Sequence, residues 1–405
     1  TGQGTVAIGR ETLKSATTAA LNVAIGYSAM YDSTEAAESV AIGGYAAGDI
    51  TTGKYNTAVG YTALRSATTS QRNTALGYAA MRDYTQASDS YNVAVGMYAM
   101  QNVTEGSSNV AIGYNALAGV ASNDMDYNVA IGAQALYYNT TGDENTALGR
   151  NALFDNTTGN ENVAIGSSAG ENNTTSGRSV FVGSYSGYQS TGDKNVYIGY
   201  DSGKESRAGV ENVSLGYQAG MNQNVGNYSV LIGSEAARNA TGVDSSVIIG
   251  RQAVGAAAAT GDNNVVMGYR AAYDLTSGYE NVAVGYVASS DMTTGKKNTH
   301  IGSYAGTGNT SGDNNTAVGS SALQENQDGD ENTALGYFAL YNTNPSSGEG
   351  DNVGIGSTAG YTNTTGVRNV FIGRRAGYNN TTSSNNIYIG ETAGYTSTEG
   401  TENVV

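Results

Sequence analysis

A single short motif recurs along the whole chain and limits what the chain can fold into. The pattern N-[VT]-x-[IVL]-G-x-x-A, with a few conservative replacements, is found 23 times in 405 residues. Positions within each copy are counted from its glycine, the motif glycine. Most motif glycines lie 17 residues apart, and the other intervals are 16, 18, 19 or 20 residues. Because a helix pair or a propeller blade needs about 34 or 40 residues, this shorter period predicts one coil of a β-solenoid.

The residues before the motif glycine have the pattern of a short strand. Position −3 is β-branched in every copy and position −1 is aliphatic or Met, which predicts a strand whose Val and Ile side chains are buried. The glycine supplies a positive φ or a close backbone approach, and Ala at position +3 predicts a tightly packed corner. Three copies provide the representative repeat residues: Asn22, Val23, Ile25, Gly26, Ala29, Asn109, Val110, Ile112, Gly113, Ala116, Asn332, Leu335, Gly336 and Ala339.

One coil is not stable by itself. It buries apolar surface worth about 5 kcal/mol, whereas ordering its residues costs on the order of 25 kcal/mol. Stacking offsets this cost because each strand then pairs above and below. We therefore predict an all-β fold: one continuous parallel β-solenoid domain over residues 1–405, with about 23 coils of 17 residues. The chain opens within one copy and stops as the next begins, which predicts uncapped ends and a fragment or shaft of a longer fibre.

Composition excludes several classes of protein. One Pro excludes collagen, and the absence of Cys excludes disulfide scaffolds and Cys-based zinc sites. The single His, His300, stands where most copies have Ala, and we interpret it as a surface substitution without a catalytic or metal-binding role. A net charge of −16 is unfavourable for binding nucleic acid or anionic membranes. No apolar run has the ~20 residues of a transmembrane helix, and we expect no cofactor or metal.

Two residue types recur at fixed positions and are candidates for function. Asn at position −4 is typical of an amide ladder between coils, and glycan or ice recognition is the alternative. Tyr at position +1 offers an aromatic face and a hydroxyl, which suits receptor binding, contact between chains, or packing at a corner. The candidate receptor or interchain contacts are Tyr27, Tyr61, Tyr78, Tyr114, Tyr217 and Tyr337.

The turns between copies vary in length and charge. The longest expansions, residues 82–91 and 341–351, are candidate receptor loops or tolerated insertions. Acidic turns such as Gly142-Asp143-Glu144 suit Ca²⁺, although the GGxGxD repeat of calcium-loaded β-rolls is missing and solvated turn residues are the favoured interpretation.

The repeat resembles a known family. The strings NVAIGYSA at 22–29 and NVAIGYNA at 109–116 resemble the NSVAIGxxS repeat of YadA-like heads in trimeric autotransporter adhesins. The string NTALGYFAL at 332–340 is similar to repeats of phage tail fibre proteins. The resemblance implies a left-handed parallel β-roll, three identical chains in a rod, and an extracellular place on a cell surface or virion tail. The adhesin period is shorter than 17 residues and its Ser is mostly Ala here, which leaves the trimer contacts open.

These observations predict a structural and adhesive fibre segment that attaches to a host cell or surface through a glycan or protein receptor, without catalysis. A self-assembling filament whose subunits stack end to end is one alternative. A polysaccharide-degrading tailspike enzyme is the other, and it requires two carboxylates roughly 5 to 10 Å apart in a groove.

Overall fold

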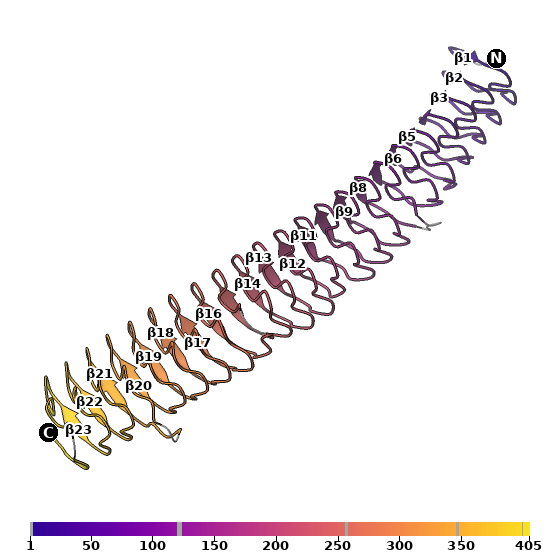
Figure 1. Ribbon diagram of the computed structural model, residues 1–405. Coiled ribbons are helices and arrows are strands. Elements are labelled where there is room, and N and C mark those ends of the chain that lie inside the picture. Colours follow the sequence, from indigo (N-terminus) through magenta and orange to yellow (C-terminus); the bar gives the residue numbers. More distant parts are fainter. Residues whose placement is uncertain (1–2, 120–123, 256–257, 346–347, 399) are drawn as a thin grey trace. The chain divides into compact units, whose positions relative to one another are not determined.

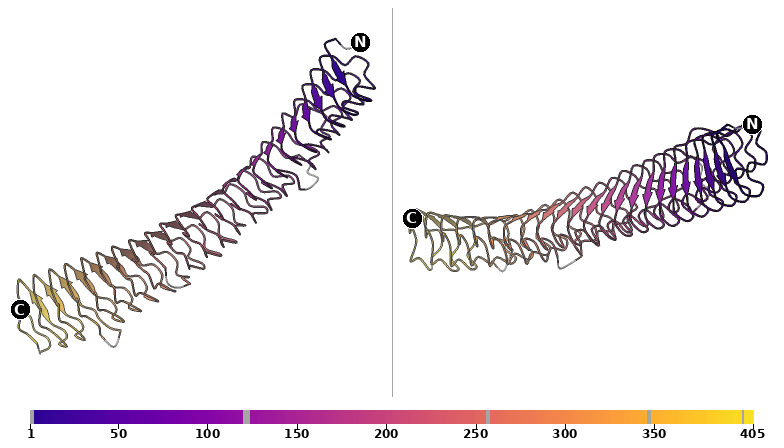
Figure 2. Two further views of the ribbon diagram at one scale, coloured as in Figure 1. Left: turned by 45° about the horizontal axis from the view of Figure 1, so that its top comes forward. Right: turned by 90° about the horizontal axis from the view of Figure 1, so that it is seen from above.

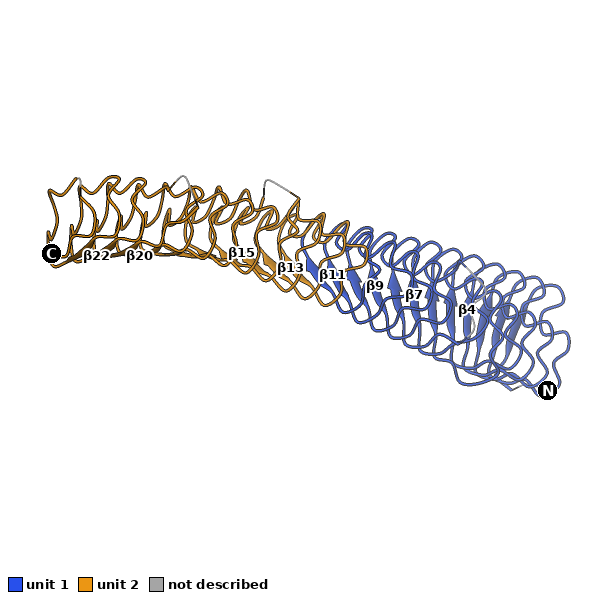
Figure 3. Ribbon diagram, turned by 90° about the horizontal axis from the view of Figure 1, so that it is seen from below, with its two compact units in different colours: residues 1–200 blue, residues 201–405 orange. Residues whose placement is uncertain are grey.

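Each motif copy forms one coil of a parallel β-solenoid, as predicted (Figure 1). The computed structural model describes residues 3–119, 124–255, 258–345, 348–398 and 400–405. The chain divides into two compact units, residues 1–200 (unit 1) and 201–405 (unit 2), which Figure 3 shows in different colours. Strands, turns and bends account for the regular structure in these described ranges, and no helix occurs among them.

Every strand has three residues and ends one residue before a motif glycine. The strands of unit 1 are β1 Val6–Ile8, β2 Val23–Ile25, β3 Val40–Ile42, β4 Thr57–Val59, β5 Thr74–Leu76, β6 Val93–Val95, β7 Val110–Ile112, β8 Val129–Ile131, β9 Thr146–Leu148, β10 Val163–Ile165, β11 Val180–Val182 and β12 Val196–Ile198. The strands of unit 2 are β13 Val213–Leu215, β14 Val230–Ile232, β15 Val247–Ile249, β16 Val265–Met267, β17 Val282–Val284, β18 Thr299–Ile301, β19 Thr316–Val318, β20 Thr333–Leu335, β21 Val353–Ile355, β22 Val370–Ile372 and β23 Ile387–Ile389.

Equivalent positions of neighbouring coils pair in register. Within each unit every strand pairs in parallel with the strands before and after it in the sequence, and Figure 2 shows the strands following one another along one side of the coils. The 20-residue interval does not shift this register, since Thr333 pairs with Val353 and Leu335 with Ile355. The irregular intervals are therefore absorbed outside the strands.

The buried face of the strands is the opposite of the predicted one. The middle residue, usually Ala, is buried in every strand from β2 to β23, whereas positions −3 and −1 are half-buried or exposed. In β7, for example, Ala111 is fully buried and Ile112 is 38% exposed. The corner Ala at position +3, such as Ala29 or Ala116, is also buried. The interior of the coil accepts mainly small side chains, so the bulkier Val and Ile lie on the outer face.

The interior keeps its volume by exchanging residues between two positions. Where the strand centre is Ala, position +4 is often Leu or Met, as in the coil with Ala334 and Leu340. Where the strand centre is aromatic, position +4 is Gly. A Cβ built on Gly377 would overlap the ring of Phe371, the strand centre of the same coil. This complementary choice explains why position +4 alternates between large residues and glycine.

Glycine at the motif position is required for two reasons. In Gly319, as in the other motif glycines, φ is strongly positive, at +133°. A Cβ on the same residue would lie 2.5 Å from the carbonyl oxygen of Gly336, the motif glycine of the next coil. Both the positive φ and the close approach predicted from the sequence are confirmed.

The Asn residues at position −4 form the predicted amide ladder. Asn145 donates to Asn128 Oδ1 through its backbone N at 3.0 Å and its side-chain Nδ2 at 3.2 Å. The same Nδ2 donates to the carbonyl oxygen of Gly159 at 2.8 Å. Asn162 repeats the arrangement on Asn145, and these side chains are fully buried. Asn22, Asn109 and Asn332 occupy the same internal position, which leaves them no role as an external binding surface.

Candidate interaction surfaces

The outer face of the strands is an apolar stripe. We use the name outer stripe for the side chains at positions −3 and −1, one of each per strand. They are β-branched or aliphatic throughout, apart from one Met, and none is charged. Of the representative residues, Val23, Ile25 and Val110 are half-buried, while Ile112 and Leu335 are exposed. A continuous exposed apolar patch on a polar protein commonly marks an interaction site.

The Tyr residues of unit 1 form a ladder that runs across six coils. Four of the predicted candidates, Tyr27, Tyr61, Tyr78 and Tyr114, take part in it, and all four are exposed. Two half-buried rings from position +2 complete it, and the sequence analysis did not single them out. The successive ring-centroid distances are 5.2, 6.0, 5.5, 5.4 and 6.2 Å for Tyr27–Tyr45–Tyr61–Tyr78–Tyr98–Tyr114.

The two remaining candidates lie in unit 2. Tyr217 is 50% exposed and Tyr337 is 55% exposed. The ring of Tyr337 contacts that of Phe338 at 4.3 Å and is followed by a separate stack at position +5. In that stack, Tyr341, Tyr361, Tyr378 and Tyr395 lie nearly parallel with centroids 5.2 to 5.4 Å apart. The rings of this stack thus pack between coils and are half-buried.

The 82–91 expansion folds back onto unit 1 instead of projecting from it. Tyr84 is fully buried, and its hydroxyl donates to the carbonyl oxygen of Gly106 at 2.6 Å. Asn92 Nδ2 donates to the same hydroxyl at 3.0 Å. Burial raises the pKa of Tyr84 to about 12. The expansion is anchored by this residue. Part of the 341–351 expansion, residues 346–347, lies outside the described residues.

The acidic turns form a second ladder. At position −6, Asp143 Oδ1 accepts from the backbone N of Asp126 at 2.7 Å, and Asp330 Oδ1 accepts from the backbone N of Asp313, also at 2.7 Å. These carboxylates therefore link neighbouring coils, a role that their sequence pattern did not reveal. Within the part of the chain that the structure describes, no group of three or more His, Cys, Asp or Glu side chains is arranged to hold a metal ion.

His300 is inside the solenoid, so its interpretation as a surface substitution is wrong. It is fully buried at the centre of β18, and its Nδ1 lies 2.6 Å from the Ser289 hydroxyl. Its Nε2 has no hydrogen-bond partner. Gly306 provides the space for the ring, because a Cβ there would overlap it. Burial lowers the pKa of His300 to about 4, so the ring is neutral near pH 7.

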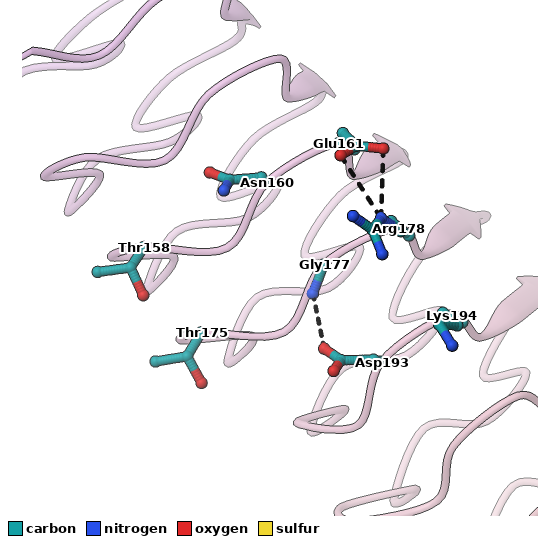
Figure 4. A pocket seen from close by; sticks show the side chains of 8 residues that line it. All are labelled: Thr158, Asn160, Glu161, Thr175, Gly177, Arg178, Asp193 and Lys194. Atoms are coloured by element: carbon teal, nitrogen blue, oxygen red, sulfur yellow. Dashed lines mark hydrogen bonds and ion pairs between the residues drawn. The ribbon is translucent and has the colours of Figure 1, made fainter.

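Two shallow hollows lie on unit 1, and both are lined by side chains from neighbouring coils. One, of about 210 Å³, is polar and is shown in Figure 4. Glu161 pairs with Arg178 across its rim at 3.4 Å, and Asp193 accepts from the backbone N of Gly177 at 2.9 Å. The other, of about 310 Å³, lies beside the first rungs of the Tyr ladder.

No protein-family model matches the chain, and no curated protein matches it. Among the described residues, no helix is long and apolar enough to cross a membrane.

Proposed function

We propose that this chain is a structural and adhesive segment of an extracellular fibre, located on a bacterial surface or a phage tail, in which three copies associate along their outer stripes. The observation that carries the proposal is the outer stripe itself. Each strand adds one β-branched and one aliphatic side chain (in one strand Met) to the surface, in strict register with its neighbours. Covering this stripe removes apolar surface from water at every coil.

A second copy of the same chain fits this stripe better than an unrelated partner does. The stripe repeats once per coil, so a partner that covers it needs apolar residues at the same spacing over many coils. An identical solenoid meets that condition automatically, and an interface made from the same patch on each subunit is the usual basis of closed symmetric oligomers. The stripe is also uncharged, which allows close contact in a chain whose net charge is −16.

Attachment is assigned to the surfaces that remain outside such a trimer. Tyr rings lie next to one another within the Tyr ladder of unit 1 and, separately, within the Tyr stack of unit 2. Tyr at such positions favours protein or glycan contacts because it joins an apolar ring to a polar tip. The rigid solenoid then acts as the support for these rows, without a chemical step.

Assembly tests this proposal most directly. Sedimentation and cross-linking of the full chain are expected to give a discrete trimer. Replacing Ile112 by Lys, together with Leu148 by Lys, places charges in the stripe of unit 1 and is expected to shift the chain to monomers. The matched control replaces Tyr127 and Tyr138, both exposed outside the stripe, by Lys and is expected to retain the trimer. A wild-type monomer contradicts the proposal, and open-ended polymers indicate the end-to-end filament.

Function is tested separately by binding the intact trimer to candidate host cells and by incubating it with host polysaccharide. We expect binding that the double Lys variant loses through its lost avidity. We expect no release of oligosaccharide, whereas steady release identifies the tailspike alternative.

A further inference from the structure

The hollow of about 310 Å³ on unit 1 combines aromatic and polar walls. Its lining includes the rings of Tyr27, Tyr31 and Tyr45 and the carboxylates of Asp32 and Asp49. Glu11 and Arg65, from the coils on either side of these, also line it, together with Ser28 and Gly48. The volume lies at the lower end of the range for small-molecule sites, which combine apolar walls with a few orienting polar groups.

The aromatic wall is made of Tyr27, Tyr31 and Tyr45, and Arg65 lies over the Tyr45 ring at 5.4 Å from its centroid. The rings of Tyr27 and Tyr45 are 5.2 Å apart with an interplanar angle of 80°, so the face of one ring lies beside the edge of the other. Tyr31 is fixed by Lys14, whose Nζ donates to the Tyr hydroxyl at 2.9 Å. A sugar ring is complementary to such a wall, because its C–H groups pack on an aromatic face while its hydroxyl groups reach polar neighbours.

The charges around the hollow favour a neutral ligand. Glu11 lies 3.8 Å from Arg10 and 3.9 Å from Lys14, and Asp49 lies 3.9 Å from Arg65. The carboxylates repel an anionic ligand. The chain's own cations neutralise much of the negative charge that a cationic ligand requires. Carboxylate acceptors and a guanidinium donor remain, and together they match the hydroxyl groups of a neutral saccharide.

We propose that this hollow binds a neutral saccharide unit of a receptor glycan. One sugar ring packs against Tyr27 and Tyr45, its hydroxyls donate to Asp32 and Asp49, and Arg65 donates to a sugar oxygen. The Tyr ladder continues from Tyr45 in steps of 5.4 to 6.2 Å and offers contacts to further units of the same glycan. The inference rests on the proposed adhesive function and specifies the class of its receptor.

The test measures binding of the full chain to maltohexaose, cellohexaose and mannohexaose by saturation-transfer NMR and calorimetry. At least one of these neutral oligosaccharides is expected to bind, with saturation passing from the protein to the sugar protons that contact Tyr27 and Tyr45. Tyr27→Leu and Asp32→Ala are each expected to raise Kd about tenfold, since each removes one principal contact. Both residues are partly solvent-exposed, and thermal melting checks that the variants remain folded.

Tyr286→Leu is the matched control, because Tyr286 occupies the same repeat position in unit 2 and is equally exposed. It is expected to leave Kd unchanged. Binding of peptides that contain Arg or Lys, without any oligosaccharide binding, overturns the inference. Oligosaccharide binding that Tyr27→Leu and Asp32→Ala leave unaltered also overturns it. If none of the three oligosaccharides binds while the trimer still adheres to cells, this inference fails and the adhesive function stands.

Discussion

At the scale of single residues, replacing a glycine in this chain can cost stability in two ways: through a strained φ and through overlap with the backbone of the next coil. Gly319 and Gly348 both have a positive φ, +133° and +81°, but their surroundings differ. A Cβ on Gly319 would lie 2.5 Å from the Gly336 carbonyl oxygen, whereas a Cβ on Gly348 would lie 3.4 Å from Asp330 Oδ2, an ordinary contact with a flexible side chain. Substitution of either residue strains φ, but only Gly319 adds a backbone overlap.

We therefore expect Gly348→Ala to lower the free energy of unfolding by about 1–3 kcal/mol, the usual cost of a strained φ. Gly319→Ala is expected to cost clearly more, since the next coil must move to accept the methyl group. Urea unfolding of both variants, followed by circular dichroism, measures the difference. Equal losses in the two variants would show that backbone contact between coils contributes nothing at this position.

At the scale of the strand and its corner, the core residues behave as exchangeable pairs. His300 with Gly306 does in one coil what Ala317 with Leu323 does in the next. Leu is tolerated at position +4 despite a positive φ, since Leu323 has φ +50° and Gly306 has φ +55°. The double substitution His300→Ala with Gly306→Leu should therefore restore a packed interior, whereas His300→Ala alone leaves a cavity.

The protonation of His300 makes the stability of the fold depend on pH. The pKa of His300 is lowered to about 4 by burial, against 6.5 when it is exposed on unfolding. A lowered pKa means that the unfolded chain binds the proton more tightly, so stability is full above pH 6.5 and is lost as pH falls towards 4. The loss is expected to be about 3 kcal/mol. Urea unfolding at pH 7 and pH 4 should show that acidification costs the wild type about 3 kcal/mol more stability than it costs the double variant. Equal losses in both would refute this role of His300.

The sequence predicted the period, the strand positions, the Asn ladder and the corner glycine because each depends on residues that repeat in every coil. It did not predict which strand face is buried. Alternation identifies two faces, but both are apolar here, and the narrow interior decides in favour of Ala24 over Val23 and Ile25. His300 was misplaced for the same reason. The hollow beside Tyr27 is lined by residues at positions +1, +2, +5 and +6 of four neighbouring coils, so no single copy of the motif contains it.

At the scale of the whole molecule, stacking identical coils also stacks like charges. Burial raises the pKa of Asp49, Asp155 and Asp274, and in each a carboxylate one coil away raises it further: Asp32, Glu171 and Asp291 respectively. The repeat that aligns apolar side chains thus brings acidic side chains together wherever neighbouring coils both carry one. With a net charge of −16, few cations are present to offset this repulsion.

These raised pKa values make the stability of the chain depend on pH. A carboxylate whose folded pKa is raised binds its proton more tightly in the folded state, so stability is greatest below the ordinary pKa and falls as pH rises through the raised one. In the double variant His300→Ala with Gly306→Leu, we expect the melting temperature to increase as pH is lowered from 7 towards the ordinary Asp pKa of 3.8, with 1 M NaCl reducing the increase by screening the exposed part of the repulsion. Replacing Asp32, Glu171 and Asp291 by their amides should flatten the profile, because each remaining carboxylate then loses its like-charged neighbour. The His300 effect has the opposite sign, and the pair His300→Ala with Gly306→Leu separates the two. A melting temperature that falls steadily from pH 7 to 4 in that double variant would show that the stacked carboxylates do not govern stability in this range.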